Sequence, residues 1–303
     1  MKKIFLMILL LIFATVPLTV NAAVYQQGVV YVIYDATGEN APKNMTDANS
    51  NGVPDMVEDV ATQVNAAREL FNGEFNFPDP LKSSRFKNVT CIEVDILSKT
   101  NMKNRNGVAY GGARKAKHNP AERAIHIKIA NTLNPHKNST PAHEYFHLIQ
   151  YGATYFRNKW FLEGMARWSQ DAVQKTDKYP DGRNFPQTLN SSAAENKIFQ
   201  GSYDTANSLW YPLAVNMNDK AKIPARLVNK YRYVDGSRVF HDDVFYGPNV
   251  MRETLNVMKS KEEFAANSEQ YANVGEWRKK GQRDQRNNKI IMDCVKEVYG
   301  SNK

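Results

Sequence analysis

Two segments of the chain alternate between apolar and polar residues, the pattern of a strand with one buried face. In Cys91–Leu97 three apolar residues alternate with Glu93 and Asp95, and residues 124–130 place three isoleucines on one face. We expect both segments to be strands, with Glu93 and Asp95 pointing outward. Residues 29–34 are apolar on both faces, which indicates a central strand.

Helical periodicity separates and follows these strands. From Asp55 to about Phe71, apolar side chains recur along one side of a helix. Beyond Trp160 the pattern is mostly helical. The order of elements predicts an α+β chain, with a mixed-sheet N-terminal lobe over about residues 23–152 and a mostly helical C-terminal lobe over about residues 153–303.

The first 22 residues have the pattern of a secretory signal. Two lysines precede eleven apolar residues at positions 4–14, and V-N-A at residues 20–22 offers a small-x-small cleavage site. Eleven apolar residues are too few to span a bilayer, and no later segment resembles a transmembrane helix. We therefore expect removal of residues 1–22 and a secreted or periplasmic protein of residues 23–303. A retained N-terminal anchor is the alternative.

Composition and charge are those of an ordinary globular protein. The 303 residues include 40 Lys and Arg against 31 Asp and Glu, and 42% are hydrophobic, which excludes a disordered chain. We expect the basic run at residues 277–289 to be a solvated helix face remote from the chemistry below, not a nucleic-acid-binding surface. Cys91 and Cys294 are the only cysteines. In an oxidising compartment they could form one disulfide, and two buried thiols are the alternative.

The strongest motif is H-E-Y-F-H at residues 143–147, which fits H-E-x-x-H. On a helix, His143 and His147 lie one turn apart on the same face, so both imidazoles can bind one metal ion. Glu144 can then accept a proton from the attacking water. Two core histidines without a metal are the alternative.

A second motif, W-F-L-E-G-M-A at residues 160–166, places Glu163 sixteen positions after His147. An oxygen ligand from a following helix would complete a three-ligand site and leave a fourth position for water, as in hydrolytic zinc sites. A structural zinc site would usually include cysteine, and neither cysteine lies near this region. We therefore predict that His143, His147 and Glu163 bind zinc. An acid that only caps a helix is the alternative for Glu163.

These two motifs resemble those of the gluzincin metallopeptidases, and W-x-x-E-G-x-A is similar to the third-ligand motif of their aminopeptidase branch. The wider layout over residues 28–171 resembles secreted bacterial metalloproteases. The resemblance implies a zincin-like fold. It also implies the zinc-ligand role for His143, His147 and Glu163, and the general-base role for Glu144.

Two departures from the family pattern bear on activity. In the aminopeptidase branch, a G-x-M-E-N-type segment supplies an acid that holds the amino terminus of the substrate, whereas residues 106–112 contain no acid. We therefore expect an endopeptidase, in which this segment is an edge strand that pairs with an extended substrate. Thermolysin-like enzymes carry Asp four residues after the ligand Glu, where this chain has Arg167. Asp171 is a candidate to orient the histidines instead.

A hydrolytic site also needs a hydrogen-bond donor for the oxyanion that develops on the scissile carbonyl. Gluzincins commonly use a downstream Tyr or His for this role. The candidates in this chain are Tyr203, Tyr211, His241 and Tyr246. We favour Tyr203, because it precedes an apolar helical stretch at residues 209–215 that can pack behind the site.

Residues 47–58 fit the calcium-loop pattern D-x-[DN]-x-[DN]-G-x5-E at every specified position. The predicted Ca2+ ligands are the side chains of Asp47, Asn49, Asn51, Asp55 and Glu58 and the carbonyl of Val53. Pro54 has no N–H with which to pair the loop to a second one, so we expect a solitary structural site. A polar turn before a helix is the alternative.

Together, these patterns predict a secreted zinc-dependent endopeptidase that acts on protein or peptide substrates and carries a structural calcium ion. One alternative is a non-catalytic zincin-like module that binds an extracellular protein or glycan.

Overall fold

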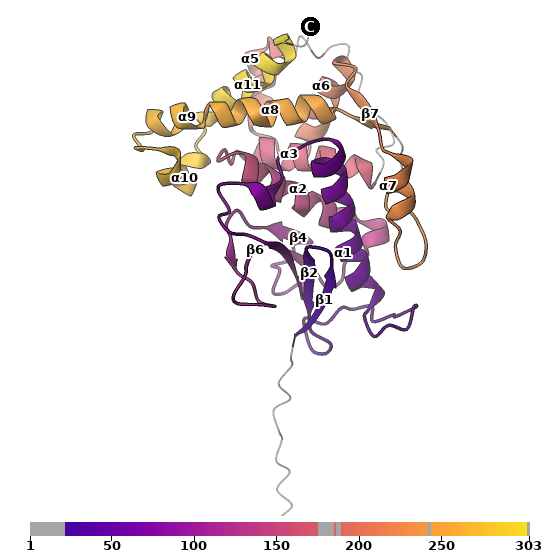
Figure 1. Cartoon of the computed structure of the whole chain (residues 1–303). Coiled ribbons are helices and arrows are strands. Elements are labelled where there is room, and N and C mark those ends of the chain that lie inside the picture. Colours follow the sequence, from indigo (N-terminus) through magenta and orange to yellow (C-terminus); the bar gives the residue numbers. More distant parts are fainter. Residues whose placement is uncertain (1–21, 175–184, 186–188, 241–243, 302–303) are drawn as a thin grey trace, which may run out of the picture.

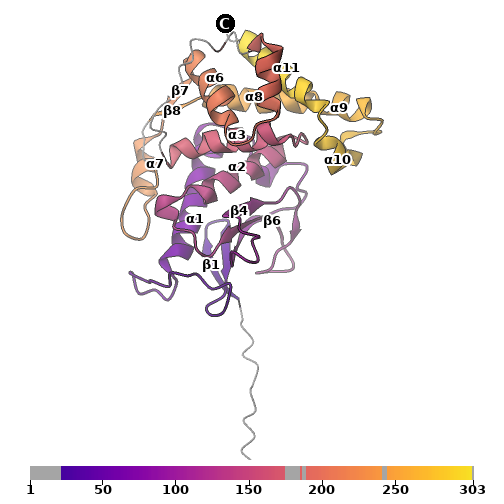
Figure 2. The ribbon, with the colours of Figure 1, turned by 180° about the vertical axis from the view of Figure 1, so that it is seen from behind.

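A sheet forms one end of the molecule and helices form the other, as the computed structural model shows (Figure 1). Helices α2 (Thr140–Ala153) and α3 (Lys159–Ser169) cross the middle, between the strands and the C-terminal helices (Figure 2). This α+β architecture confirms the predicted class. The structure describes residues 22–174, 185, 189–240 and 244–301. The predicted signal, apart from Ala22, lies outside the described residues.

The main sheet has the strand order β1-β2-β3-β6-β4, and β5 also pairs with β6. The pairs β2–β3 and β3–β6 are parallel and the other pairs are antiparallel, so the sheet is mixed, as predicted. β2 pairs with β1 and β3 and is therefore the central strand that its apolar residues predicted. The strands are β1 Ala23–Gln27, β2 Val30–Tyr34, β3 Cys91–Leu97, β4 Gly107–Ala109, β5 Arg114–Lys115 and β6 Arg123–Ala130.

The charged face of β3 differs from the prediction. Glu93 and Asp95 alternate with apolar residues, but both are buried rather than directed into solvent. Arg114 lies 3.1 Å from Glu93 and 3.0 Å from Asp95, and Lys117 lies 2.8 Å from Asp95. Backbone N–H groups of Lys117 and His118 also donate to Glu93. The segment after β4 therefore covers this face and satisfies the acids in place of water.

Helix α1 (Asp55–Arg68) begins where the sequence predicts and continues into a π-helical turn at Glu69–Glu74. The other α-helices of the described residues are α5 Ser192–Phe199, α6 Tyr211–Asn216, α7 Ala225–Lys230, α8 Pro248–Ser260, α9 Glu262–Ser268, α10 Lys279–Gln282 and α11 Asn287–Ser301. A small antiparallel sheet, β7 (Lys220–Lys222) and β8 (Val244–Tyr246), lies among them. Within the described residues, no helix is both long and apolar enough to cross a membrane.

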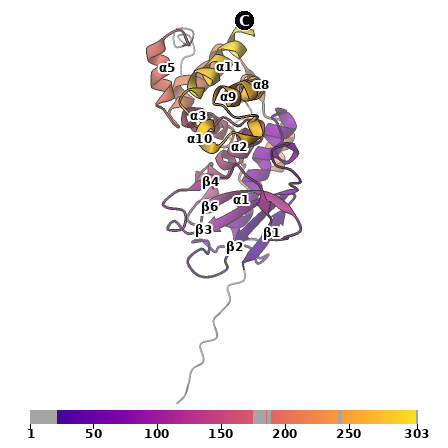
Figure 3. The same ribbon diagram turned by 90° about the vertical axis from the view of Figure 1, so that its left-hand side faces the viewer.

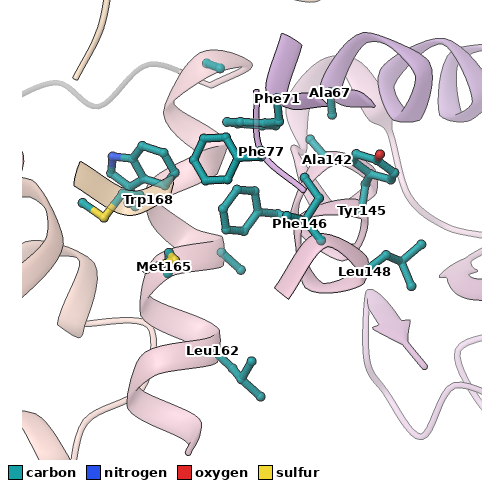
Figure 4. Close-up of a cluster of buried hydrophobic side chains, with 14 of the residues drawn as sticks. Ala67, Phe71, Phe77, Ala142, Tyr145, Phe146, Leu148, Leu162, Met165 and Trp168 are labelled. Carbon is teal, nitrogen blue, oxygen red and sulfur yellow. The ribbon is translucent and has the colours of Figure 1, made fainter. Parts of the chain in front are cut away.

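One hydrophobic cluster runs from the sheet to α11 and holds α2 and α3 in the middle. Phe146 of α2 and Trp168 of α3 meet there with Phe71 and Phe77 (Figure 4). The Phe146 ring contacts Phe71 and Trp168 edge to face, with centroids 5.1 and 5.7 Å apart. Each such pair stabilises the fold by about 0.5–1.5 kcal/mol beyond the contribution of the apolar area that it buries. With this face of α2 buried, its two histidines lie on the face that borders the cleft described below.

The predicted disulfide is wrong, because Cys91 and Cys294 are both buried free thiols. Cys91 begins β3 in the sheet, whereas Cys294 lies in α11 at the opposite end of the molecule (Figure 3). A disulfide needs Cα atoms within about 7 Å of each other. The layer formed by α2 and α3 lies between the two elements and prevents this approach.

Candidate metal centre

His143, His147 and Glu163 bring their donor atoms together at one point, and we call these three residues the metal centre. Nε2 of His143 and Nε2 of His147 lie 3.4 and 3.5 Å from the same oxygen, Oε2 of Glu163. In a tetrahedral zinc site with bonds of about 2.0–2.2 Å, ligand atoms are about 3.3–3.6 Å apart. The two histidine–glutamate distances therefore match ligands around one ion.

A direct ion pair between the imidazoles and the carboxylate is the competing interpretation. Charge-assisted N–H···O bonds are about 2.7–2.9 Å long, and both distances here exceed that. Oε2 of Glu163 is buried and, within the described part of the chain, has no hydrogen-bond partner of acceptable geometry. A buried oxygen in this condition fits a metal ligand better than it fits an ion pair.

A glutamine holds His147 from behind. Oε1 of Gln150 lies 2.8 Å from Nδ1 of His147, and Nε2 of Gln150 donates to the carbonyl of Leu162 at 3.1 Å. Because the amide nitrogen of Gln150 is used at Leu162, its oxygen faces the ring and Nδ1 carries the hydrogen. Nε2 of His147 then presents its lone pair toward Glu163, ready for a metal.

Gln170 supports His143 in the same way. Its Oε1 lies 3.3 Å from Nδ1 of His143 and accepts a bond from Nη1 of Arg167 at 3.2 Å, while its Nε2 donates to Ser139. The sequence suggested Asp171 for this role, and the neighbouring Gln170 occupies the position instead. Arg167, a departure from the family pattern, thus supports a ligand through Gln170.

Glu144 lies beside the metal centre and against β4. A Cβ atom added to Gly107 would lie 2.5 Å from Oε1 of Glu144, so only glycine leaves room for this carboxylate. Burial raises the pKa of Glu144, and the imidazoles of His143 and His147 partly offset this effect. A carboxyl group with a raised pKa is better suited to accept a proton near neutral pH.

The charged groups of the metal centre shift one another's pKa values. Burial would raise the pKa of Glu163, but the imidazoles of His143 and His147 hold that pKa well below its ordinary value. Burial would lower the pKa of His147, and the carboxylates of Glu163 and Glu144 raise it instead. Protons and a metal ion therefore compete for Nε2 of His147, and metal affinity should fall in acid.

The metal centre opens into a cleft of about 1020 Å³. β4 forms one wall, and it pairs with β6 through the carbonyl of Asn106 at 2.8 Å and the N–H of Tyr110 at 3.1 Å. Because hydrogen-bonding direction alternates along a strand, Gly107 and Ala109 turn their main-chain groups away from β6 and toward the cleft. β4 is thus the edge strand that the sequence predicted.

Tyr203 lines the same cleft, with its ring centroid 5.7 Å from that of His143. Tyr203 is 53% exposed, and its partial burial together with the nearby carboxylate of Glu163 raises its pKa to about 12. The phenol therefore keeps its proton at neutral pH and can donate it in a hydrogen bond. Of the other candidate donors, Tyr211 is buried in the core and Tyr246 lies in β8, and neither is among the residues that line the cleft. His241 lies outside the described residues.

Positive charge dominates the lining of the cleft. The cations are Arg105, Lys137, Lys159, Arg167 and Arg283. Arg283 belongs to the basic run that we expected to be remote from the site, so that expectation is wrong for this residue. The acids of the lining are Glu144, Glu163 and Asp204; Glu163 belongs to the metal centre and Glu144 lies beside it. The remaining excess of positive charge attracts acidic groups.

Sequence reasoning missed several side chains that surround the metal centre. Gln150 follows His147 by three residues, and this helical spacing is the signal that could have found it. Tyr151 stacks on His147 with ring centroids 5.8 Å apart, and the guanidinium of Arg157 lies 3.7 Å from the centre of the Tyr151 ring. Gln170 directly follows α3, whereas His143 lies in α2, so no local sequence pattern indicates that the two side chains meet.

The predicted calcium loop folds around Glu58. Its two carboxylate oxygens accept bonds from Nδ2 of Asn49 and Nδ2 of Asn51, each 2.9 Å long. Gly52 adopts a φ of +85°, and its N–H donates to Asp47 at 2.7 Å. Asn49, Asn51 and Glu58 therefore meet at the start of α1, whereas Asp47 holds the backbone of the loop.

Comparison with known proteins assigns no family. No protein-family model, curated protein or solved structure matches the chain. The gluzincin resemblance therefore rests on the two motifs. The fold brings the histidines of the first motif and the glutamate of the second to one point.

Proposed function

We propose that the protein is a zinc-dependent endopeptidase of the gluzincin type, with a zincin-like fold and a secreted or periplasmic location. The convergence of His143 and His147 on one oxygen of Glu163 carries this proposal. Two imidazoles and a carboxylate suit zinc, and three protein ligands leave room for water or substrate. Glu144 beside these ligands supplies the acid–base group that hydrolysis needs.

The residues of the cleft divide the chemical work among them. When bound, zinc polarises the scissile carbonyl and lowers the pKa of water. Glu144 accepts a proton from the attacking water and passes it to the leaving amine. Tyr203 donates a hydrogen bond to the developing oxyanion. The free edge of β4 holds the substrate extended through main-chain hydrogen bonds.

Replacement of Glu144 by Gln tests this proposal directly. The variant should keep the zinc content of the wild type, because Glu144 is not a ligand. Its hydrolysis of casein or of a peptide should fall by about 10²–10⁴-fold, because the proton acceptor is lost. Full activity in this variant would contradict the mechanism. Stoichiometric zinc in a wild-type protein that cleaves nothing would favour the binding module for an extracellular protein or glycan.

We propose acidic peptides as preferred substrates, because cations line the cleft outside the metal centre. Cleavage profiling of a peptide library, with and without a zinc chelator, should show Asp and Glu enriched around the cleaved bond. Lys159→Glu should lower kcat/KM for acidic peptides by about fivefold, as expected for one surface charge pair. Lys87→Glu, an exposed lysine outside the cleft, should leave it unchanged. A profile indifferent to substrate charge would contradict this preference.

We also propose that the loop at residues 47–58 binds Ca2+ and stabilises the start of α1. Three acids among the ligands suit a Kd of about 10⁻⁵–10⁻³ M. Titration calorimetry of metal-free protein should detect this binding, and Glu58→Gln should abolish it. Absence of binding to the wild type would exclude the calcium site.

Export is proposed from the N-terminal segment. Expression of the full chain should deliver a protein that begins at Ala23 outside the cytoplasm. Amino-terminal sequencing checks this, and an intact residue 1 on the exported protein would favour the retained anchor.

A further inference from the structure

A second group of metal-binding side chains lies on the sheet. Sγ of Cys91, a ring nitrogen of His118 and a carboxylate oxygen of Glu122 lie within 4.8 Å of one another. Cys91 begins β3, and the other two residues belong to the turn between β5 and β6. We call these three residues the cysteine site.

The cysteine site is separate from the metal centre. In β6, Ala124 pairs with Cys91, whereas Ile129 pairs with Gly107 next to Glu144. Five residues of strand correspond to about 16 Å. Cys91 also packs in a small apolar cluster of its own, outside the main core.

Glu93 fixes the orientation of His118. Oε1 of Glu93 lies 2.9 Å from Nδ1 of His118 and also accepts the backbone N–H of His118 at 3.1 Å. The ring stacks on Tyr31 with centroids 3.7 Å apart. Because a buried carboxylate accepts these bonds, Nδ1 carries the hydrogen and Nε2 presents a lone pair.

That lone pair has no hydrogen-bond partner among the residues that the structure describes. The side chain of His118 is 9% exposed, and its Nε2 is buried. Nε2 lies 3.9 Å from Oε2 of Glu122, which is itself held by the hydroxyl of Thr90 at 2.8 Å. Two acceptors that face each other cannot bond directly, but a cation between them satisfies both. For metal–ligand bonds of about 2.0–2.3 Å, ligand atoms are about 3.3–3.8 Å apart, close to the 3.9 Å between Nε2 of His118 and Oε2 of Glu122.

We propose that Cys91, His118 and Glu122 form a second metal site, which binds a zinc-type divalent transition ion. Sulfur and imidazole ligands select such an ion over Ca2+ and Mg2+, which take oxygen ligands. On binding, the S–H bond of Cys91 breaks, its proton leaves to solvent and the sulfur bonds to the metal without a redox change. The side chain of Glu122 is 34% exposed and provides a path for the ion. The bound ion ties the start of β3 to the β5–β6 turn.

Cobalt distinguishes this site from the metal centre, because thiolate-to-cobalt charge transfer requires a sulfur ligand and the metal centre has none. Titration of the purified, reduced protein with Co2+ should develop this near-ultraviolet absorption. Excess Zn2+ should remove it, and excess Ca2+ should leave it in place. Absence of the absorption, or its removal by Ca2+, would overturn the proposal.

Variants locate the sulfur ligand. Cys91→Ala should abolish the cobalt absorption, whereas Cys294→Ala, the matched buried thiol, and His143→Ala in the metal centre should retain it. Absorption that survives Cys91→Ala would overturn the assignment. Glu122→Gln alters the turn without touching the core, and should lower Co2+ affinity by at least about tenfold. Unchanged affinity in this variant would count equally against the site.

Discussion

Oε1 of Gln150 lies 2.8 Å from Nδ1 of His147, while the amide nitrogen of the same side chain donates to Leu162. A single glutamine on α2 therefore orients His147, a proposed metal ligand, and bonds to α3, the helix that carries Glu163. Because His147 and Glu163 come from different helices, this side chain also helps to set the distance between these two proposed ligands.

Loss of this glutamine should loosen the metal without unfolding the protein. For Gln150→Ala we expect zinc affinity to fall by about 10–100-fold, the usual effect of removing the partner of a ligating histidine. Competition with a chromophoric chelator measures this change. Gln200→Ala, at an exposed glutamine after α5, should retain wild-type affinity. Equal affinities in the two variants would show that Gln150 does not orient the ligand.

The contact between β4 and Glu144 predicts a sharp effect of one methyl group. In Gly107→Ala the new Cβ would displace the Glu144 carboxylate, and a displacement of about 1 Å can cost about 100-fold in rate. We expect kcat to fall by about 10–100-fold while zinc content stays unchanged. Gly112→Ala is the matched control, since no atom of the described residues lies within 4 Å of its added Cβ. Similar kinetics in both variants would argue against this role of Gly107.

The phenol of Tyr203 should act on the transition state alone. Removal of one oxyanion donor costs about 10²–10³-fold in kcat, so Tyr203→Phe should show such a loss with little change in KM or zinc content. Tyr271→Phe, a tyrosine outside the cleft, should behave as the wild type. Full activity of Tyr203→Phe would leave the oxyanion without this donor and remove Tyr203 from the mechanism.

His126 should make stability depend on pH. Burial and the charge of Arg114 lower the pKa of His126 to about 4, against about 6.5 in an unfolded chain. Between pH 6.5 and 4, His126 is therefore protonated in the unfolded state and neutral in the folded state. The neutral, buried His126 contributes its full stabilisation above pH 6.5, and this contribution is lost as the pH falls toward 4. Between pH 7 and 5, the free energy of unfolding should fall by about 1–2 kcal/mol more in the wild type than in His126→Gln. Urea unfolding at both pH values measures the difference, and parallel losses would contradict the prediction.

Features that depend on residues close in sequence could be predicted. The alternation in β3 and β6 located both strands, because successive side chains of a strand point to opposite faces. The spacing of His143 and His147 placed both imidazoles on one helical face for the same local reason. The apolar run after Asp55 likewise located α1.

Features that depend on how distant segments meet could not be predicted. The sequence predicted that Glu93 and Asp95 face solvent. Their partners, Arg114 and its neighbours, lie about twenty residues further along the chain, so the local pattern gave no sign of them. Gln170 reaches His143 because α3 packs against α2, and aromatic contacts in the core determine that packing. Cys91 and Cys294 are far apart because α2 and α3 lie between the sheet and α11. No sequence pattern near either cysteine indicates this arrangement.

The free edge of β4 has a consequence for the protein as a population of molecules. An unpaired strand edge is a template for any second strand, including the same edge of another copy, and proteins commonly protect such edges with charge. Two copies that met at this edge would bring together two clefts lined by cations, among them Arg105 and Lys137. The cations for which we propose acidic peptide substrates should thus also oppose self-association, and replacing them by neutral residues should increase aggregation.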